Sequence, residues 1–132
     1  MILSALLLLS SAQAADPQPN CDDPMTQTEM NICSWESYQR ADAELNAAWS
    51  RASERAKESD RSAAEYDGPT DAHARLLAAQ RLWLQFRDAH CLAENGTREN
   101  SGTIWPLLQN GCLEALTEAR TAQLRQYVEM PN

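Results

Sequence analysis

Aromatic and turn-forming residues are scarce in this sequence of 132 residues. Phe, Trp and Tyr together make up 6% of it, and only four glycines occur. Apart from Pro131, the glycines and prolines are confined to the residues before Thr26, to Gly68–Pro69 and to the stretch from Gly96 to Gly111. Three long segments therefore lack the residues that break helices. No stretch alternates apolar and polar residues as a half-buried strand would, so we expect an all-α fold.

Basic residues are also in the minority. The sequence has 11 Lys and Arg against 19 Asp and Glu, which gives a formal net charge of −8. A chain of this charge repels nucleic acid and anionic membrane surfaces, and it favours basic partners. We therefore expect a protein partner and no nucleic acid.

Long apolar runs are missing except at the very start. MILSALLLLSSAQA combines an apolar run with the A-x-A pattern Ala12-Gln13-Ala14, which predicts a signal peptide over residues 1–14 and a single domain over residues 15–132. The run is too short for a membrane span, and Gln18-Pro19-Asn20 before Cys21 is no lipid-attachment motif. We expect a periplasmic or secreted protein without a membrane anchor.

Groups that carry catalysis or hold metals are few. The sequence lacks a glycine-rich phosphate loop and a nucleophilic serine elbow. Its two histidines, His73 and His90, have no partner at helical i,i+4 spacing for a zinc pair. The cysteine separations do not fit a metal knuckle. We expect no enzyme activity, no cofactor and no metal site.

The first long segment begins with a helix-capping pattern. Thr26-Gln27-Thr28-Glu29 has the form of a capping box, which predicts a helix from Thr26 to about Glu58. Its inward face repeats every three or four residues. This face comprises Met30, Ser34, Tyr38, Ala41, Leu45, Ala48, Trp49 and Ala52.

Two further helices complete the expected bundle. The second should run from Thr70 or Asp71 to Asn95–Gly96, and the third from about Gly111 to Glu129, with a separate turn around Ile104–Pro106 covering the end. The apolar arc of the second helix spans more than half of its circumference, which places this helix in the middle of a three-helix up-down-up bundle. The arc comprises Leu76, Leu77, Ala79, Trp83, Leu84, Phe86 and Cys91.

Four cysteines, at positions 21, 33, 91 and 112, come together at one end of such a bundle. An even count in an exported chain indicates two disulfides. We favour Cys33–Cys91 with Cys21–Cys112, because Cys21 lies in a flexible lead-in and can reach over. The other two pairings remain open.

Arg87 and Gln80 lie near the centre of the apolar arc of the second helix. A buried guanidinium needs a carboxylate and further acceptors, and Asp42 on the first helix projects to the inward face. We predict a polar cluster that fixes the register of the helices, and we favour this structural role over a catalytic one. Its members are Asp42, Gln80 and Arg87, joined by Asp88, Asn46 and Arg120.

These polar residues and cysteines belong to five motifs along the chain. The motifs are Thr26-Gln27-x-Glu29-Met30-Asn31-x-Cys33, Ala41-Asp42-x-x-Leu45-Asn46, Ala79-Gln80-Arg81-x-Trp83-x-x-Phe86-Arg87-Asp88-x-x-Cys91, Gly102-Thr103-Ile104-Trp105-Pro106 and Cys112-x-x-x-Leu116-Thr117-x-x-Arg120-x-x-x-Leu124. Their order resembles the bacterial family named for the lysozyme inhibitor LprI, and the resemblance covers nearly all of residues 15–132. It implies an exported helical domain with paired cysteines and, by the member that names the family, inhibition of c-type lysozyme.

An acidic protein suits a basic c-type lysozyme, because complementary charge speeds association. We expect the contact surface at the disulfide end, where Asp22, Asp23, Glu94, Arg98 and Glu99 lie in loops or at helix ends. The alternative is a periplasmic structural or interaction module that binds an endogenous protein or a cell-wall component without inhibiting lysozyme.

Overall fold

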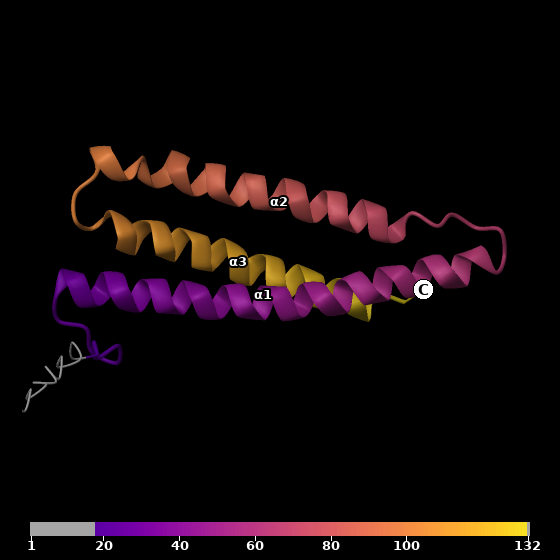
Figure 1. Ribbon diagram of the computed structural model, residues 1–132, viewed down its shortest axis with the longest axis horizontal. Coiled ribbons are helices and arrows are strands. Elements are labelled where there is room, and N and C mark those ends of the chain that lie inside the picture. The colour runs from indigo at the N-terminus through magenta and orange to yellow at the C-terminus, as the bar shows by residue number, and fades with distance from the viewer. Residues whose placement is uncertain (1–17, 132) are drawn as a thin grey trace, which may run out of the picture.

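Three long helices run alternately back and forth along the molecule (Figure 1). The computed structural model describes residues 18–131, and the expected signal peptide over residues 1–14 lies outside this range. The helices are α1 (Gln27–Ala64), α2 (Ala72–Asn95) and α3 (Trp105–Glu129), with the short 3-10 helix η1 (Arg98–Asn100) between the last two. Residues 18–131 contain no strand, which confirms the all-α prediction.

The predicted capping box at the start of α1 is present. The Thr26 hydroxyl accepts a hydrogen bond from the Glu29 amide at 3.1 Å, and the Glu29 carboxylate accepts from the Thr26 amide at 3.0 Å. The carboxylate also accepts from the Met25 amide at 2.8 Å. These bonds satisfy amides that have no partner within the helix.

The helix α1 continues to Ala64, past the predicted end near Glu58. Its extra turns position the start of α2, because the Asp60 carboxylate accepts hydrogen bonds from the amides of Ala72 and His73 at 2.7 and 3.1 Å. An acidic group at a helix N-terminus also interacts favourably with the helix dipole. Asp71, the residue before α2, makes no side-chain cap of its own and pairs with Arg75 instead.

The prediction for the start of α3 was wrong by about two turns. The expected separate turn around Ile104–Pro106 is the first turn of α3, and Gly111 lies inside the helix. Pro106 favours this start, since its missing amide costs nothing in a first turn. The Trp105 indole N–H donates to the Gly96 carbonyl oxygen at 2.9 Å and ties the start of α3 to the end of α2.

The apolar core is small and is made mainly by α1 and α3. Alanines of α1 allow the two helices to approach, and α2 packs more sparsely against both. The expectation that α2 lies in the middle, with a wide apolar arc, was therefore wrong. The buried apolar cluster comprises Leu45, Ala48, Ala52, Ala56, Leu76 and Leu124, with Trp49, Trp83, Tyr127 and Val128 partly buried against it.

Two disulfides lie at the end where α1 begins, α2 ends and α3 begins. They join Cys21 to Cys33 and Cys91 to Cys112, so the prediction of two disulfides at one end is confirmed. The favoured pairing of Cys33 with Cys91 was wrong. Cys21 stays beside α1, to which its own segment leads, while the antiparallel neighbours α2 and α3 bring Cys91 and Cys112 together.

Candidate functional site

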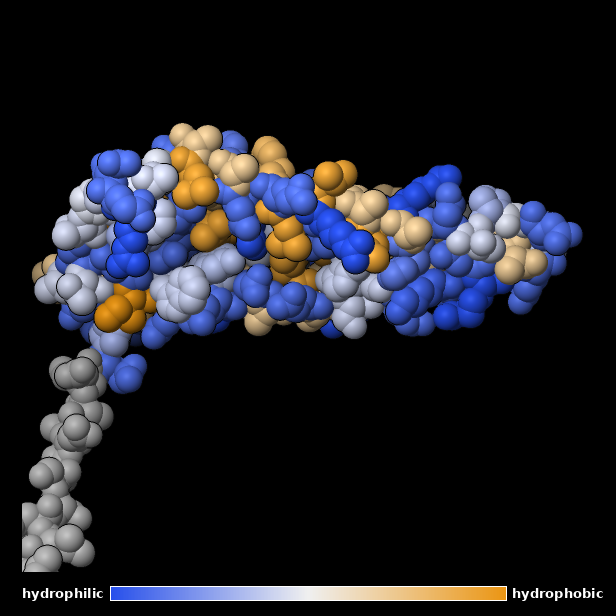
Figure 2. Space-filling view, turned by 45° about the horizontal axis from the view of Figure 1, so that its top comes forward, coloured by the Kyte–Doolittle hydropathy of each residue, from blue (hydrophilic) through white to orange (hydrophobic). Residues whose placement is uncertain are grey.

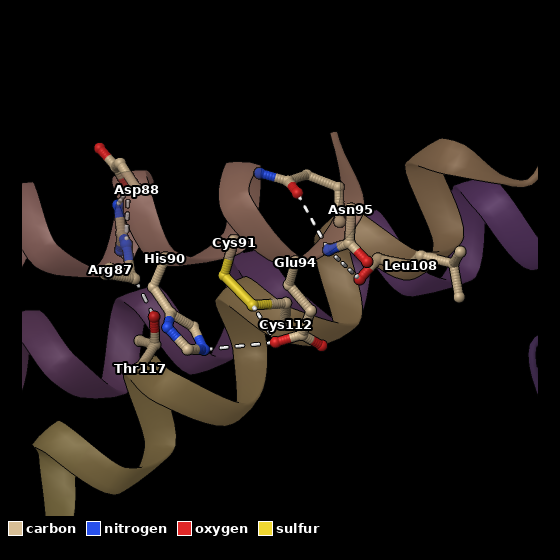
Figure 3. Close-up of a disulfide and its surroundings, with 10 residues drawn as sticks. Arg87, Asp88, His90, Cys91, Glu94, Asn95, Leu108, Cys112 and Thr117 are labelled. Carbon is tan, nitrogen blue, oxygen red and sulfur yellow. Dashed lines mark hydrogen bonds and ion pairs between the residues drawn. A yellow bond between two sulfur atoms is a disulfide. The ribbon is translucent and has the colours of Figure 1, made fainter. Parts of the chain in front are cut away.

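Arg87 is the most completely buried charged side chain among the described residues, with 7% of its surface exposed. Its guanidinium donates to the Asp88 carboxylate from Nε at 2.9 Å, and its terminal nitrogens lie 2.9 Å from Asp88 and 3.9 Å from Asp42. A further N–H donates to the Thr117 hydroxyl on α3 at 3.4 Å (Figure 3). One side chain of α2 thus contacts both other helices.

Two aromatic rings enclose the same guanidinium. The Arg87 Cζ lies 5.7 Å from the Tyr38 ring centroid and 5.3 Å from that of Trp83, which is cation–π geometry. Burial raises the pKa of the Tyr38 hydroxyl, and the Arg87 charge opposes this rise. The phenol therefore stays neutral across the physiological pH range.

The other residues of the predicted cluster divide into two groups. Asn46 donates to Asp42 at 3.4 Å and so joins the Arg87 group. Gln80 and Arg120 form a second pair, in which the Arg120 Nε donates to the Gln80 amide oxygen at 2.9 Å. Burial lowers the pKa of Arg120, yet an arginine remains charged at neutral pH. Gln80 and Arg87 are buried on the inner side of α2, and each contacts a residue of another helix.

Thr117, Tyr38 and Trp83 were not foreseen as partners of Arg87. Thr117 is fully buried in α3. Its occurrence between Leu116 and Arg120 in one of the family motifs was the only sequence feature that could have indicated its role. Tyr38 and Trp83 lie at positions that fit the apolar face of their helices. This pattern predicts core residues and gives no indication that they contact a charged side chain.

The predicted contact residues lie at the disulfide end and are exposed. Asp22 and Asp23 follow Cys21 directly, Arg98 and Glu99 belong to η1, and Glu94 lies in the last turn of α2. The Glu94 carboxylate lies 3.3 Å from His90 Nε2, beside the Cys91–Cys112 bond (Figure 3). These charges surround the same end without forming one compact cluster.

An apolar groove opens at this end between α1 and α3. It has a volume of about 510 Å³. Trp35 and Ile32 of α1 are 48% and 41% exposed there, next to Trp105 and Pro106 of α3. Arg98 lines both this groove and an adjoining hollow, which Gln27, Asn31 and Thr103 also line. An exposed tryptophan such as Trp35, beside a partly buried one such as Trp105, is typical of protein contact sites.

Two contacts resemble elements of metal or hydrolytic sites. His90, Glu94 and Cys112 lie within 4.8 Å of one another, but Cys112 is held in a disulfide and offers no thiolate. The Ser53 hydroxyl lies 2.9 Å from His73 Nε2. Ser53 is 9% exposed, and Asp60 binds backbone amides rather than the imidazole. The Ser53–His73 contact joins α1 to α2, and the His90–Glu94 contact lies on the surface of α2.

No helix within residues 18–131 is long and apolar enough to cross a membrane.

Comparison with known proteins agrees with this architecture. The family model described as "Lysozyme inhibitor LprI" matches residues 20–124. An uncharacterised protein of Rhizobium meliloti (strain 1021) is 35% identical over 129 residues, which cover 96% of this chain and 92% of the relative. No solved structure matches the chain. Both disulfides, the Arg87 group and the groove at the disulfide end lie within the matched residues, and the chain belongs to the LprI family.

Proposed function

We propose that this protein is an exported protein-binding module that binds and inhibits basic c-type lysozyme through its disulfide end. The family description supplies the class of partner. The groove with Trp35 and Ile32 is the observation that carries the choice of surface, because an exposed tryptophan often contributes much of the energy of a protein contact.

Charge supports the same pairing. The net charge of −8 attracts a basic protein, and Asp22, Asp23 and Glu99 lie around the same end. Complementary charge raises the association rate and makes it sensitive to salt. The signal peptide predicted over residues 1–14 and the paired cysteines fit a periplasmic or secreted location.

A lysis assay tests the proposal. Bacterial cells are exposed to c-type lysozyme with and without micromolar mature protein, and clearing is followed by turbidity, with binding measured in parallel by calorimetry. We expect slower lysis and a binding constant that weakens as salt is raised. Absence of both protection and binding would contradict the proposal and favour an endogenous protein or cell-wall partner.

A pair of variants tests the surface. Trp35→Ala should weaken lysozyme binding at least about tenfold, as expected for a contact tryptophan. Tyr66→Ala is the matched control, since Tyr66 is 82% exposed in the turn after α1, at the opposite end of the molecule. Equal effects of the two substitutions would exclude the groove as the contact site.

A further inference from the structure

The helix α2 buries its polar side and exposes its apolar side. Gln80 and Arg87 are 7% exposed, whereas Leu82 is 66% and Phe86 is 54% exposed. At about 100° per residue, Leu82 and Phe86 project away from the side that carries Gln80 and Arg87. The space-filling view shows hydrophobic side chains gathered along the side where α2 lies (Figure 2).

This outward side forms a continuous row. Ala78, Leu82, Phe86, Ala89 and Ala93, here called the outer row, follow each other at spacings of three or four residues, and all are exposed. Leu92 flanks the row and is 45% exposed. The row carries no charged side chain over roughly 22 Å of helix. Contiguous apolar surface of this kind marks an interaction site, whereas single exposed apolar residues do not.

We propose that the outer row is the interface of a homodimer in which α2 pairs antiparallel with α2 of a second copy. The row is self-complementary, because its large residues Leu82 and Phe86 lie near the middle and alanines lie toward both ends. A two-fold axis near positions 84 and 85 places Leu82 of each copy beside Phe86 of the other at the centre, and the alanines allow the two helices to approach toward both ends. An interface with such an axis uses the same surface twice.

Charge on the flank of the row fits the same arrangement. Arg81 and Asp88 lie on one flank, on opposite sides of the centre of the row, and both are exposed. In an antiparallel pair each flank meets the same flank of the partner. Arg81 of each copy therefore comes near Asp88 of the other, which gives two opposite-charge pairs.

A second copy fits the row better than a basic lysozyme does. A basic partner is attracted to carboxylates, and the outer row contains none. The row also shares no residue with the groove at the disulfide end, so dimerisation leaves that groove open. One helix face buries less than the roughly 1,600 Å² of a standard interface, so we expect a weak dimer with a dissociation constant of roughly 10 to 100 µM.

Sedimentation velocity of the mature protein over a range of concentrations tests the proposal. We expect a monomer–dimer equilibrium that Leu82→Glu and Phe86→Glu each weaken at least about tenfold. Leu108→Glu is the matched control, since Leu108 is a 48% exposed leucine on α3 outside the row. Circular dichroism confirms that each variant is folded, as expected for substitutions at exposed positions.

Two further measurements define the arrangement. Arg81→Glu should weaken an antiparallel dimer several-fold, and an unchanged dissociation constant would exclude that orientation. Raising salt from about 50 to about 500 mM should change the dimer little, because it screens both the repulsion between two copies of net charge −8 and the attraction within the Arg81–Asp88 pairs. Lysozyme binding should weaken over the same range, so the two interactions can fail separately. A monomer at all concentrations, or equal effects of Phe86→Glu and Leu108→Glu, would overturn the proposal.

Discussion

Arg87 combines the cost of a buried charge with contacts to all three helices. Its carboxylate partners remain partly solvated, since the side chain of Asp42 is 43% exposed and that of Asp88 is 60% exposed. The contacts with Tyr38, Trp83 and Thr117 therefore contribute a large share of the stabilisation that the Arg87 side chain provides. Removal of the guanidinium leaves a gap between two aromatic rings in addition to unpaired acceptors.

We predict that Arg87→Ala lowers the free energy of unfolding by about 2 to 3 kcal/mol, through lost packing and lost ion pairs. Leu82→Ala is the control from the same helix, and it should cost less than about 0.5 kcal/mol in the monomer because Leu82 is exposed. Urea denaturation followed by circular dichroism, at a protein concentration below that of dimer formation, measures both. Equal losses would contradict the role assigned to Arg87.

Glu29 makes the stability of the first turn of α1 depend on pH. Its hydrogen bonds from the Met25 and Thr26 amides lower the pKa of the carboxyl below 4.5. Since the folded-state pKa is depressed, the stabilisation is complete above pH 4.5 and is lost as the pH falls below that value. We predict that wild type exceeds Glu29→Gln in unfolding free energy at neutral pH and that this difference disappears in acid. A difference that does not decline as the pH falls below 4.5 would contradict the assignment.

The burial of Arg87 near Asp42 and Asp88 was predictable from the sequence, because a charge within an apolar arc needs carboxylates close by. The separate pairing of Gln80 with Arg120 was not predictable. Periodicity gives the side of a helix on which a residue lies, but the offset between two helices along their axes decides which polar residues meet. That offset depends on packing of the whole core.

At the scale of helices, Gly111 and Gly96 show how differently two glycines can contribute. Gly111 lies inside α3, and a Cβ placed there meets no heavy atom within 4 Å. Gly96 ends α2 with φ 70° and ψ −169°, a region that is almost restricted to glycine.

We predict that Gly111→Ala raises the free energy of unfolding by about 0.5 to 1 kcal/mol, because alanine is the better helix former. Gly96→Ala should lower it by about 1 to 3 kcal/mol through backbone strain. Thermal unfolding of the two variants beside wild type provides the comparison. A loss of stability in Gly111→Ala would show that this part of α3 is not an ordinary exposed helix.

Helix starts and ends were predictable where a local signal exists and not elsewhere. Thr26 and Gly96 were found because a capping box and a C-terminal glycine act within a few residues. The extension of α1 to Ala64 was missed, because no local signal marks it. Its last turns carry Asp60, which caps the next helix, and this contact joins residues 12 positions apart. Gly111 suggested a helix start, but Pro106 provides the actual one.

The orientation of α2 was the least predictable element. Leu82, Leu84 and Phe86 outnumber Gln80 and Arg87, so the apolar pattern alone indicates a wide buried arc. The observed helix instead buries the narrow stripe of Leu76, Gln80, Arg87 and Cys91. The rotation of α2 about its own axis depends on polar partners on α1 and α3. The sequence of α2 alone gives no information about those partners.

At the scale of the whole molecule, the two disulfides should differ in what they stabilise. Cys91–Cys112 joins two helices of the bundle across 21 residues, while Cys21–Cys33 fixes a segment that precedes α1. We predict that Cys91→Ala with Cys112→Ala lowers the free energy of unfolding by about 3 kcal/mol. Cys21→Ala with Cys33→Ala should cost less, because residues 18–26 lie outside the helices. Chemical denaturation of both double variants measures this, and the reverse order would contradict it.

The pairing of each cysteine with its nearest neighbour along the chain has a consequence for how the protein matures. The first bond needs only residues up to Cys33, and the second needs only the α2–α3 hairpin. An oxidant that joins thiols in the order in which they emerge from the export machinery therefore makes the native bonds directly. Neither bond has to wait for the far end of the polypeptide, and oxidation in this order requires no later exchange of partners.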